Sequence, residues 1–259
     1  MSVKFVILGS GSSMGVPRAD GYSGDCDLKN KKNFRTRCSA LIKFNDQNIL
    51  IDTSPDLRSQ LLKNKIRTIS KVFYTHLHAD QTHGINDLRP FFLINKKQIS
   101  VYADSNTKRY LLSTFKYCFK PSFGYPSTLD INTLKKQHQI TNKNKKILIE
   151  SIPVQHGNIK SICYLIDNKL AYASDISLFY KKDYKKLKNL KYLIIDCLWY
   201  RNHPAHFNLD QVLELVKNIT PRKTILTNMH SDLDYAKLKK RLPKNIIPGF
   251  DGMTVNLKN

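Results

Sequence analysis

Eleven short runs of mainly apolar and β-branched residues recur along this 259-residue chain, and they constrain its fold more than any other feature. Each run is four to eight residues long, which is the usual length of a strand in a sheet. The sequence therefore predicts a protein built on sheets. The runs cover residues 3–8, 39–44, 48–53, 71–75, 100–103, 147–154, 161–166, 170–174, 192–196, 224–229 and 252–257.

Longer segments with helical periodicity lie between some of these runs, at residues 54–65, 105–119, 208–219 and 233–242. Asn208, with Gln211 three residues later, forms a capping-box pattern at the start of one of them. Residues 121–146 are polar and rich in turn formers, which indicates an excursion at the surface. We expect one domain of the α/β (α+β) class over residues 1–259, with about two layers of sheet and two of helix.

Charge and cysteine content bear on the partners and the compartment. The 43 basic residues outnumber the 20 acidic ones, and the net charge of +23 attracts phosphate groups on a small molecule or on RNA. Only 10 of the basic residues are Arg, so a general compositional bias toward Lys explains the charge equally well. Five scattered cysteines favour buried thiols in a reducing compartment. With no apolar run long enough for a bilayer and no signal-peptide pattern, we predict a cytoplasmic protein without a membrane partner.

The stretch THLHADQTHG, residues 75–84, is the strongest chemical signal. Alternate residues of a strand point to the same side, so His76 and His78 project together, and Asp80 follows where the chain turns. Imidazole nitrogens and carboxylate oxygens are ligands that suit zinc or manganese. This spacing at a strand end indicates a metal site more strongly than an isolated pair of histidines does.

Three later residues also stand where a predicted strand ends: His156, Asp175 and His230. Each has an ordinary alternative, since Asp175 can cap a helix and His156 can belong to a loop before Gly157. Taken together, strand ends that offer His or Asp predict a metal pocket at one edge of a sheet.

These motifs resemble those of the metallo-β-lactamase-fold hydrolases, in which HxHxDH is followed by a His, an Asp and a final His. The stretches ILGSGSSMGVPR, THLHADQTHGINDLRPF and LTNMHSDLDYAKL are similar to the PhnP-like branch, whose best-known members are phosphodiesterases. The resemblance covers nearly the whole chain. It implies a four-layer αββα sandwich with two divalent metal ions, zinc or manganese, between the sheets.

The resemblance also divides the ligands between the two metals, with Asp175 bridging them. It implies His76, His78 and His156 for the first metal, and Asp80, Asp175 and His230 for the second. Two adjacent metals can share a hydroxide and neutralise the phosphate that it attacks.

Gln81 departs from the family pattern, which has a histidine at this position. An amide oxygen is a poorer zinc ligand but is acceptable to harder ions. We therefore expect the second metal to bind weakly or to be manganese. We expect His83, three residues beyond Asp80, to support the loop rather than to bind metal.

Three further residues have predicted roles around the metals. An Asp in the position of Asp52 braces the histidine loop in the family, although Asp52 can equally cap the next helix. The resemblance favours a general acid from the segment NHPAHFN, and we prefer His206 over His203. Asp80 and His206 are thus the predicted catalytic residues.

The sequence therefore predicts a dinuclear metal hydrolase that acts on a small, cyclic or linear, phosphodiester. An RNA-processing ribonuclease related to tRNA 3′-end nucleases is one alternative, which the basic charge favours. A non-catalytic metal-binding relative is the other. The sequence assigns no substrate-binding residue and leaves a homodimer open.

Overall fold

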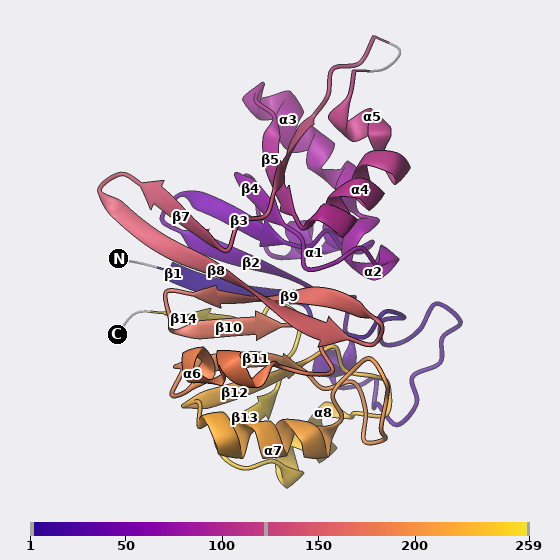
Figure 1. Ribbon diagram of the computed structural model, residues 1–259. Helices are drawn as coiled ribbons and strands as arrows, with labels where there is room; N and C mark the ends of the chain where they lie inside the picture. Colours follow the sequence, from indigo (N-terminus) through magenta and orange to yellow (C-terminus); the bar gives the residue numbers. More distant parts are fainter. Residues whose placement is uncertain (1–2, 122–123, 258–259) are drawn as a thin grey trace.

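The computed structural model describes residues 3–121 and 124–257, and its core is a pair of seven-stranded sheets packed face to face (Figure 1). In spatial order, the first sheet contains β14 (Thr254–Asn256), β1 (Val3–Gly9), β2 (Ser39–Phe44), β3 (Gln47–Ile51), β4 (Lys71–Phe73), β5 (Ile99–Ala103) and β6 (Leu129–Thr133). The second contains β13 (Ile246–Pro248), β12 (Lys223–Thr227), β11 (Tyr192–Asp196), β10 (Leu170–Ala173), β9 (Ile159–Ile166), β8 (Lys145–His156) and β7 (Gln137–Asn142).

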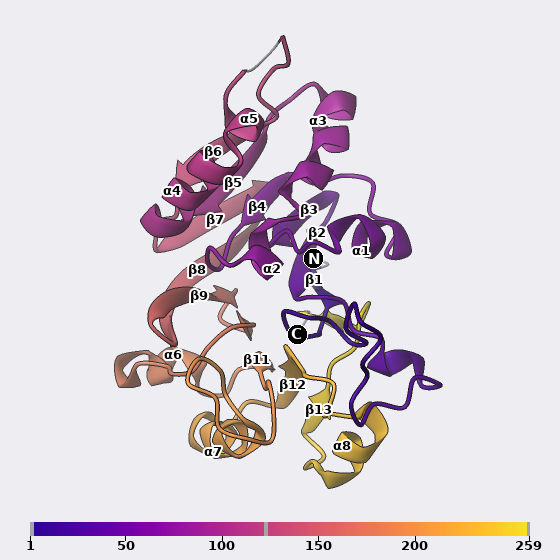
Figure 2. The ribbon, with the colours of Figure 1, turned by 90° about the vertical axis from the view of Figure 1, so that its right-hand side faces the viewer.

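Helices cover the outer face of each sheet, as the rotated view of Figure 2 shows. The first sheet carries α1 (Leu57–Lys63), α3 (Arg89–Asn95), α4 (Ser105–Thr114) and α5 (Lys116–Phe119). The second carries α6 (Tyr184–Leu187), α7 (Leu209–Ile219) and α8 (Tyr235–Arg241). The remaining helical segments are short: α2 (Ala79–Thr82) and the 3₁₀ turns Lys31–Asn33, Ile85–Leu88 and Lys181–Asp183. The predicted four-layer αββα sandwich is confirmed.

Three apolar clusters fill the three interfaces between these layers. Phe5 and Ile42 of the first sheet pack with Tyr172 and Ile194 of the second in the central cluster. A second cluster joins the first sheet to its helices, and a third joins the second sheet to α6, α7 and α8. Burial of apolar surface on both faces of each sheet explains why the strands read as continuous apolar runs.

Each of the eleven predicted runs coincides with a strand, but three strands were not predicted. The predicted surface excursion at 121–146 contains β6 and β7, the edge strands of the two sheets. Both strands mix buried positions with exposed polar ones, because an edge strand is covered on fewer sides than a central one. The third is β13, a three-residue edge strand.

The helix predictions hold in position but not always in length. Asn208 and Gln211 form both hydrogen bonds of the predicted capping box at the start of α7. The helix expected at 105–119 is divided into α4 and α5, because Phe115 leaves the helical conformation.

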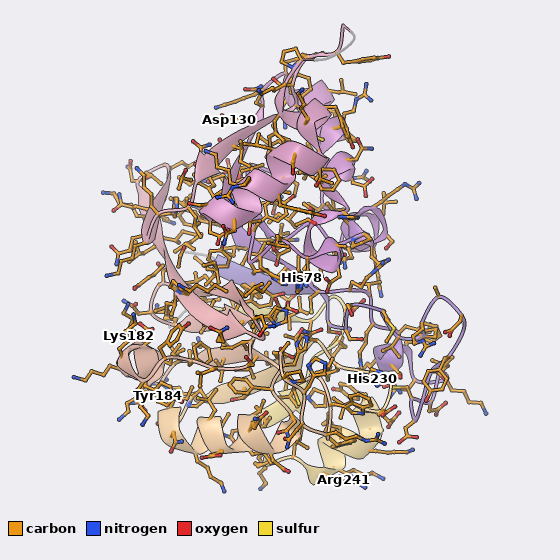
Figure 3. All side chains as sticks on the ribbon, turned by 45° about the vertical axis from the view of Figure 1, so that its right-hand side comes forward. His78, Asp130, Lys182, Tyr184, His230 and Arg241 are labelled. Atoms are coloured by element: carbon orange, nitrogen blue, oxygen red, sulfur yellow. The ribbon has the colours of Figure 1, made fainter. Side chains whose placement is uncertain are left out.

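Parallel strands bring the candidate residues to one end of the sandwich. β3 to β6 run parallel in the first sheet, and β10 to β13 run parallel in the second. The carboxyl ends of parallel strands share an edge, so the residues that follow them become neighbours. In Figure 3, His78 comes from one half of the molecule and His230 from the other, and both lie near the junction of the halves.

Two predictions from composition can be compared with the structure. All five cysteines are free and buried, as predicted. Within residues 3–121 and 124–257, no helix has the length and apolar character needed to cross a membrane.

Candidate metal centre

Three histidines from the two sheets converge at this end of the sandwich. His76 and His78 follow β4, and His156 is the last residue of β8. Their ring centroids are 4.6, 4.9 and 5.1 Å apart. His78 Nδ1 lies 3.0 Å from His76 Nε2 and 3.3 Å from His156 Nε2. One nitrogen of each ring thus faces the other two.

Hydrogen bonds on the far side of two rings determine which nitrogen carries the proton. The Ala205 carbonyl oxygen, 2.7 Å from His156 Nδ1, can only accept, so Nδ1 is protonated. The Thr75 hydroxyl lies 3.0 Å from His76 Nδ1 and donates to Asp52 Oδ2 at 2.8 Å. Since a hydroxyl has a single proton, its oxygen accepts from His76 Nδ1. In both rings the unprotonated Nε2 therefore faces the cluster.

Asp52 lies beneath the histidine loop, where the sequence places it. The residue is fully buried, with φ of 61°, and also accepts from the Thr75 amide at 2.7 Å. Burial raises the pKa of Asp52, and the two hydrogen bonds from Thr75 oppose that shift. Gly84 packs against Ser54, two residues after Asp52, so closely that a Cβ at Gly84 would collide with the Ser54 carbonyl oxygen. Asp52 and Gly84 thus set the position of the loop from both of its ends.

The three histidines fit a divalent metal ion. Burial lowers the pKa of His76 to about 3 and also lowers the pKa values of His78 and His156, so all three rings are neutral. Neutral imidazole is the form that binds metal. In a tetrahedral site with Zn–N bonds of about 2.0–2.1 Å, ligand nitrogens are about 3.3 Å apart. The 3.0 and 3.3 Å separations are close to that spacing.

Two carboxylates complete the inner surface of the site. Asp80 lies in α2, and Asp175 follows β10. Burial raises the pKa of Asp80 to about 6, and the nearby Asp175 carboxylate adds to this shift. Burial alone would raise the pKa of Asp175, but the imidazoles of His76, His156 and His206 outweigh it and lower that pKa. Both carboxylates are therefore ionised at pH 7, and Asp175 keeps its charge to lower pH than Asp80 does.

Two buried amide groups contact these carboxylates. Gln81 Nε2 donates to Asp80 Oδ2 and to Asp175 Oδ2, both at 3.1 Å. Asn228, which follows β12, donates from Nδ2 to Asp175 Oδ1 at 3.1 Å and to the Ser174 carbonyl oxygen at 2.8 Å. Sequence reasoning missed Asn228, although its place directly after an apolar strand is the same signal that identified Asp175.

His206 lies beside the histidine cluster and is held by a carboxylate that the sequence analysis missed. Asp196, the last residue of β11, accepts from His206 Nδ1 at 2.6 Å. The ring centroids of His206 and His156 are 4.7 Å apart. Burial would lower the pKa of His206, but Asp196, Asp175 and Asp80 outweigh it and raise the pKa to about 9. Asp196 could have been identified from the sequence, because it stands at the end of a predicted strand, as Asp52 does.

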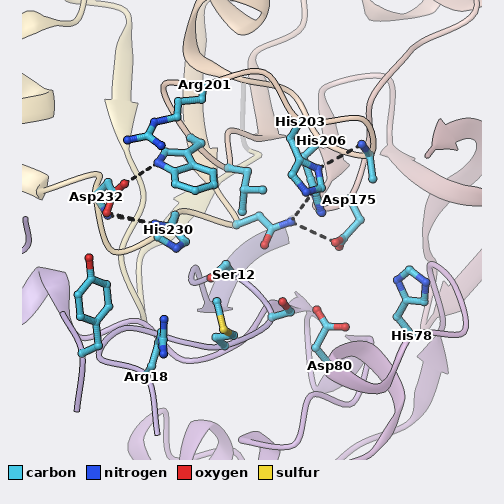
Figure 4. A pocket seen from close by; sticks show the side chains of 17 residues that line it. Ser12, Arg18, His78, Asp80, Asp175, Arg201, His203, His206, His230 and Asp232 are labelled. Atoms are coloured by element: carbon cyan, nitrogen blue, oxygen red, sulfur yellow. Dashed lines mark hydrogen bonds and ion pairs between the residues drawn. The ribbon is translucent and has the colours of Figure 1, made fainter. Parts of the chain in front are cut away.

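His230 lines the same cavity but is not brought into the histidine and carboxylate cluster. Its ring stacks on Trp199, with centroids 4.6 Å apart and planes 27° from parallel. Its Nδ1 accepts from the Asp232 amide at 3.3 Å, and Asp232 Oδ2 accepts from Trp199 Nε1 at 2.6 Å. In Figure 4, His230 lies beside Asp232 and away from His78 and Asp80. The geometry gives no support to the predicted ligand role of His230.

Two other histidines lie at the margin of the site. His83 Nε2 is 2.8 Å from the Tyr110 hydroxyl, outside the cluster, which agrees with a role in supporting the loop. The His203 ring lies beside that of His206, with centroids 5.0 Å apart and planes tilted by 51°. Of the two, His206 is nearer the cluster, since it alone groups with His156 and Asp175 as a candidate metal ligand.

The cluster opens into a cavity of about 740 Å³. Ser12, Ser13 and Met14, from the glycine-containing loop after β1, line one side. Arg201 lies over the Trp199 ring, 5.2 Å from its centroid, on the opposite side. The cavity therefore has polar and aromatic walls and a base of imidazoles and carboxylates.

Comparisons with known proteins agree with this arrangement. Residues 47–229 match the Beta-lactamase superfamily domain. The structure is similar to a crystal structure described as a new diphosphatase from the PhnP family, with a TM-score of 0.88 and 29% sequence identity. That similarity covers 99% of this chain and 97% of the other. The predicted likeness to the PhnP-like branch is confirmed.

The matching curated relatives carry two different names. An octanoyltransferase of Porphyromonas gingivalis (strain ATCC BAA-308 / W83) is 29% identical over 255 residues, which are 97% of this chain and 51% of that protein. A ribonuclease Z of Prochlorococcus marinus (strain MIT 9215) is 26% identical over 125 residues, 46% of this chain and 39% of that protein. The chain thus spans about half the length, or less, of the curated relatives it matches.

Proposed function

Because the chain belongs to the β-lactamase superfamily, we propose that it is a metal-dependent hydrolase whose substrate is a small phosphodiester. The convergence of His76, His78 and His156 carries this proposal, because their inward-facing nitrogens lie 3.0 and 3.3 Å apart beside two carboxylates. Sites of this kind activate water for hydrolysis.

An anionic substrate suits the walls of the cavity. Arg18 and Arg201 line it, so two guanidinium groups border the route to the histidines. Trp199 and Tyr22 offer aromatic surface for a substituent of the phosphate. Arginine binds phosphate through paired hydrogen bonds, and aromatic rings pack against sugar or base. A diester with an organic group on each side matches this combination.

The residues of the chain have distinct roles in the proposed reaction. A divalent metal held by His76, His78 and His156 would supply Lewis-acid activation of water and of a phosphoryl oxygen. Asp175 is ionised and adds negative charge beside that metal. His206 is protonated at neutral pH, and Asp196 holds its Nδ1, which leaves Nε2 to protonate the departing oxygen.

Hydrolysis of bis(p-nitrophenyl) phosphate tests the proposal directly. We expect turnover that is lost on dialysis against a chelator and restored by Zn²⁺ or Mn²⁺. The His78→Ala variant should be inactive, whereas His83→Ala, outside the cluster, should retain activity. A folded wild-type protein that hydrolyses none of a panel of phosphodiesters with either metal would instead support a non-catalytic metal-binding relative.

An RNA-processing ribonuclease is a second candidate, which the net charge of +23 and the likeness to a ribonuclease Z favour. Binding of tRNA that weakens steeply with salt, together with cleavage near its 3′ end, would support this candidate. The likeness to an octanoyltransferase supports no transferase activity for this chain, because the match covers 51% of that protein and the histidine cluster indicates metal-dependent hydrolysis.

A further inference from the structure

The amide side chains of Gln81 and Asn228 contact the carboxylates of Asp80 and Asp175. Their arrangement argues against the two metal ions expected from the sequence. Gln81 Nε2 stands between Asp80 and Asp175, with one hydrogen bond of 3.1 Å to each carboxylate. The Gln81 side chain is fully buried. An amide nitrogen has no lone pair for a metal and offers only protons. Its position between the two carboxylates is where a cation shared by them would have to bind.

The orientation of Asn228 is set by its neighbours. Its Nδ2 donates to the Ser174 carbonyl oxygen at 2.8 Å, and a carbonyl oxygen can only accept. Rotating the amide by 180° would place Oδ1 against that carbonyl oxygen and against the Asp175 carboxylate. The nitrogen of Asn228 therefore faces Asp175 Oδ1, and the oxygen is turned away.

The remaining candidate ligands do not make up a separate second site. Within the described residues, the other group that could hold a metal consists of His156, Asp175 and His206. His156 Nε2 already belongs to the three-histidine site, and His206 is engaged with Asp196. His230 stacks on Trp199 and lies away from Asp80 and Asp175 (Figure 4). A second metal ion would thus have fewer than three ligands that are not already engaged elsewhere.

We propose that this centre holds one metal ion per chain, and that the Gln81 and Asn228 amides replace a second cation by donating hydrogen bonds to Asp80 and Asp175. The amides stabilise the buried carboxylates without a metal, since hydrogen bonds to an ionised carboxylate favour its charged form. Gln81 Oε1 is buried without a hydrogen-bond partner, which is the cost of directing the nitrogen toward the carboxylates. This inference rests on the proposed three-histidine metal site but not on the identity of the substrate.

Metal stoichiometry tests the proposal without any activity measurement. The wild-type protein is dialysed against a chelator, titrated with Zn²⁺ or Mn²⁺ in a calorimeter, and analysed for bound metal by mass spectrometry. We expect one equivalent per chain with either ion. Two equivalents, with Gln81 turning its oxygen to the metal, would overturn the proposal. No bound metal would refute the three-histidine site itself and with it the proposed function.

A gain-of-site variant tests the role of the amides. The Gln81→His/Asn228→His double variant supplies two imidazoles next to Asp80 and Asp175, and we expect bound zinc to rise from one to two equivalents. The matched control, Gln81→Leu/Asn228→Leu, removes the same hydrogen bonds without adding ligands and should stay at one equivalent. A folded double-histidine variant that stays at one equivalent would contradict the assignment of the amides to the second position.

The single variant Gln81→His provides the test if the double variant does not fold, and circular dichroism verifies that the single variant is folded. We expect it to bind a second equivalent of zinc with at least tenfold lower affinity than the first. A single variant that binds no second equivalent at millimolar zinc would equally contradict the assignment.

Discussion

Replacing Thr75 with valine tests whether the hydrogen-bonded chain behind His76 prepares the metal site. Thr75 is buried, and its hydroxyl connects His76 Nδ1 at 3.0 Å to Asp52 Oδ2 at 2.8 Å. Valine has nearly the same shape but cannot form either hydrogen bond. Two buried polar atoms would lose a partner, so we expect the free energy of unfolding of the metal-free protein to fall by about 1–3 kcal/mol.

The effect on metal affinity is separate from the effect on stability. The Thr75 oxygen holds His76 with its proton on Nδ1 and its lone pair on Nε2, toward the cluster. Loss of such a partner behind a ligand typically weakens metal binding by about 10- to 100-fold. Zinc affinity measured by competition with a chromophoric chelator should show this loss, and urea denaturation should give the change in stability.

A second threonine provides a matched control. The Thr53 hydroxyl is also buried, lies 2.7 Å from the Tyr74 hydroxyl and donates to the Thr82 carbonyl oxygen at 3.0 Å, but it touches none of the metal histidines. Thr53→Val should reduce stability by a similar amount and leave zinc affinity unchanged. Equal zinc affinity in wild type and Thr75→Val, or an equal loss in both variants, would refute the reasoning.

Three further predictions concern catalysis, pH and folding. His206→Ala should lower kcat by about 10²- to 10⁴-fold, which is the usual contribution of a general acid. The bound zinc, measured by mass spectrometry, should stay at the wild-type amount. Loss of zinc in this variant would show that His206 is a metal ligand instead. Burial would raise the pKa of Asp56, but the bonds from Arg37 outweigh it and lower that pKa, so this pair stabilises the fold above about pH 4 and the benefit disappears as pH falls through the lowered pKa. Asp56→Asn should therefore lose about 1–2 kcal/mol in urea denaturation at pH 7 and progressively less as the pH falls below about 4, and a loss that does not change with pH would show that charge is not the cause. Asn208→Ala removes the capping box of α7 and should cost about 1 kcal/mol, whereas Asn208→Ser should restore most of it; no difference between the two variants would indicate that the cap contributes nothing.

Local sequence determined the elements of the central fold. Each apolar run predicted a strand, because strands buried on both faces need apolar residues at every position. The capping box at Asn208 and Gln211 predicted the start of α7, because both of its hydrogen bonds lie within four residues. Edge strands β6 and β7 were missed, since half-exposed strands carry polar residues that also suit loops.

The part of the site that follows from chain direction was also accessible from sequence. His76 and His78 could be placed together by strand alternation, and His156 and Asp175 by their positions at strand ends. These are the residues that the structure brings together at one end of the sandwich. Their convergence depends on the direction of each strand, on where each strand ends and on the face-to-face packing of the two sheets.

Only the tertiary structure decided between Asn228 and His230. The sequence offered a histidine two residues after an asparagine at the end of β12, and alternation would point both side chains to the same side. Asn228 adopts φ of 58°, which breaks the extended conformation, so the direction of the following residues no longer follows that of the strand. The sequence by itself thus determined that polar side chains would meet at one end of the sheets. The backbone turn after β12 and the packing of Trp199 decided which of them face the carboxylates, because these depend on contacts between residues far apart in the chain.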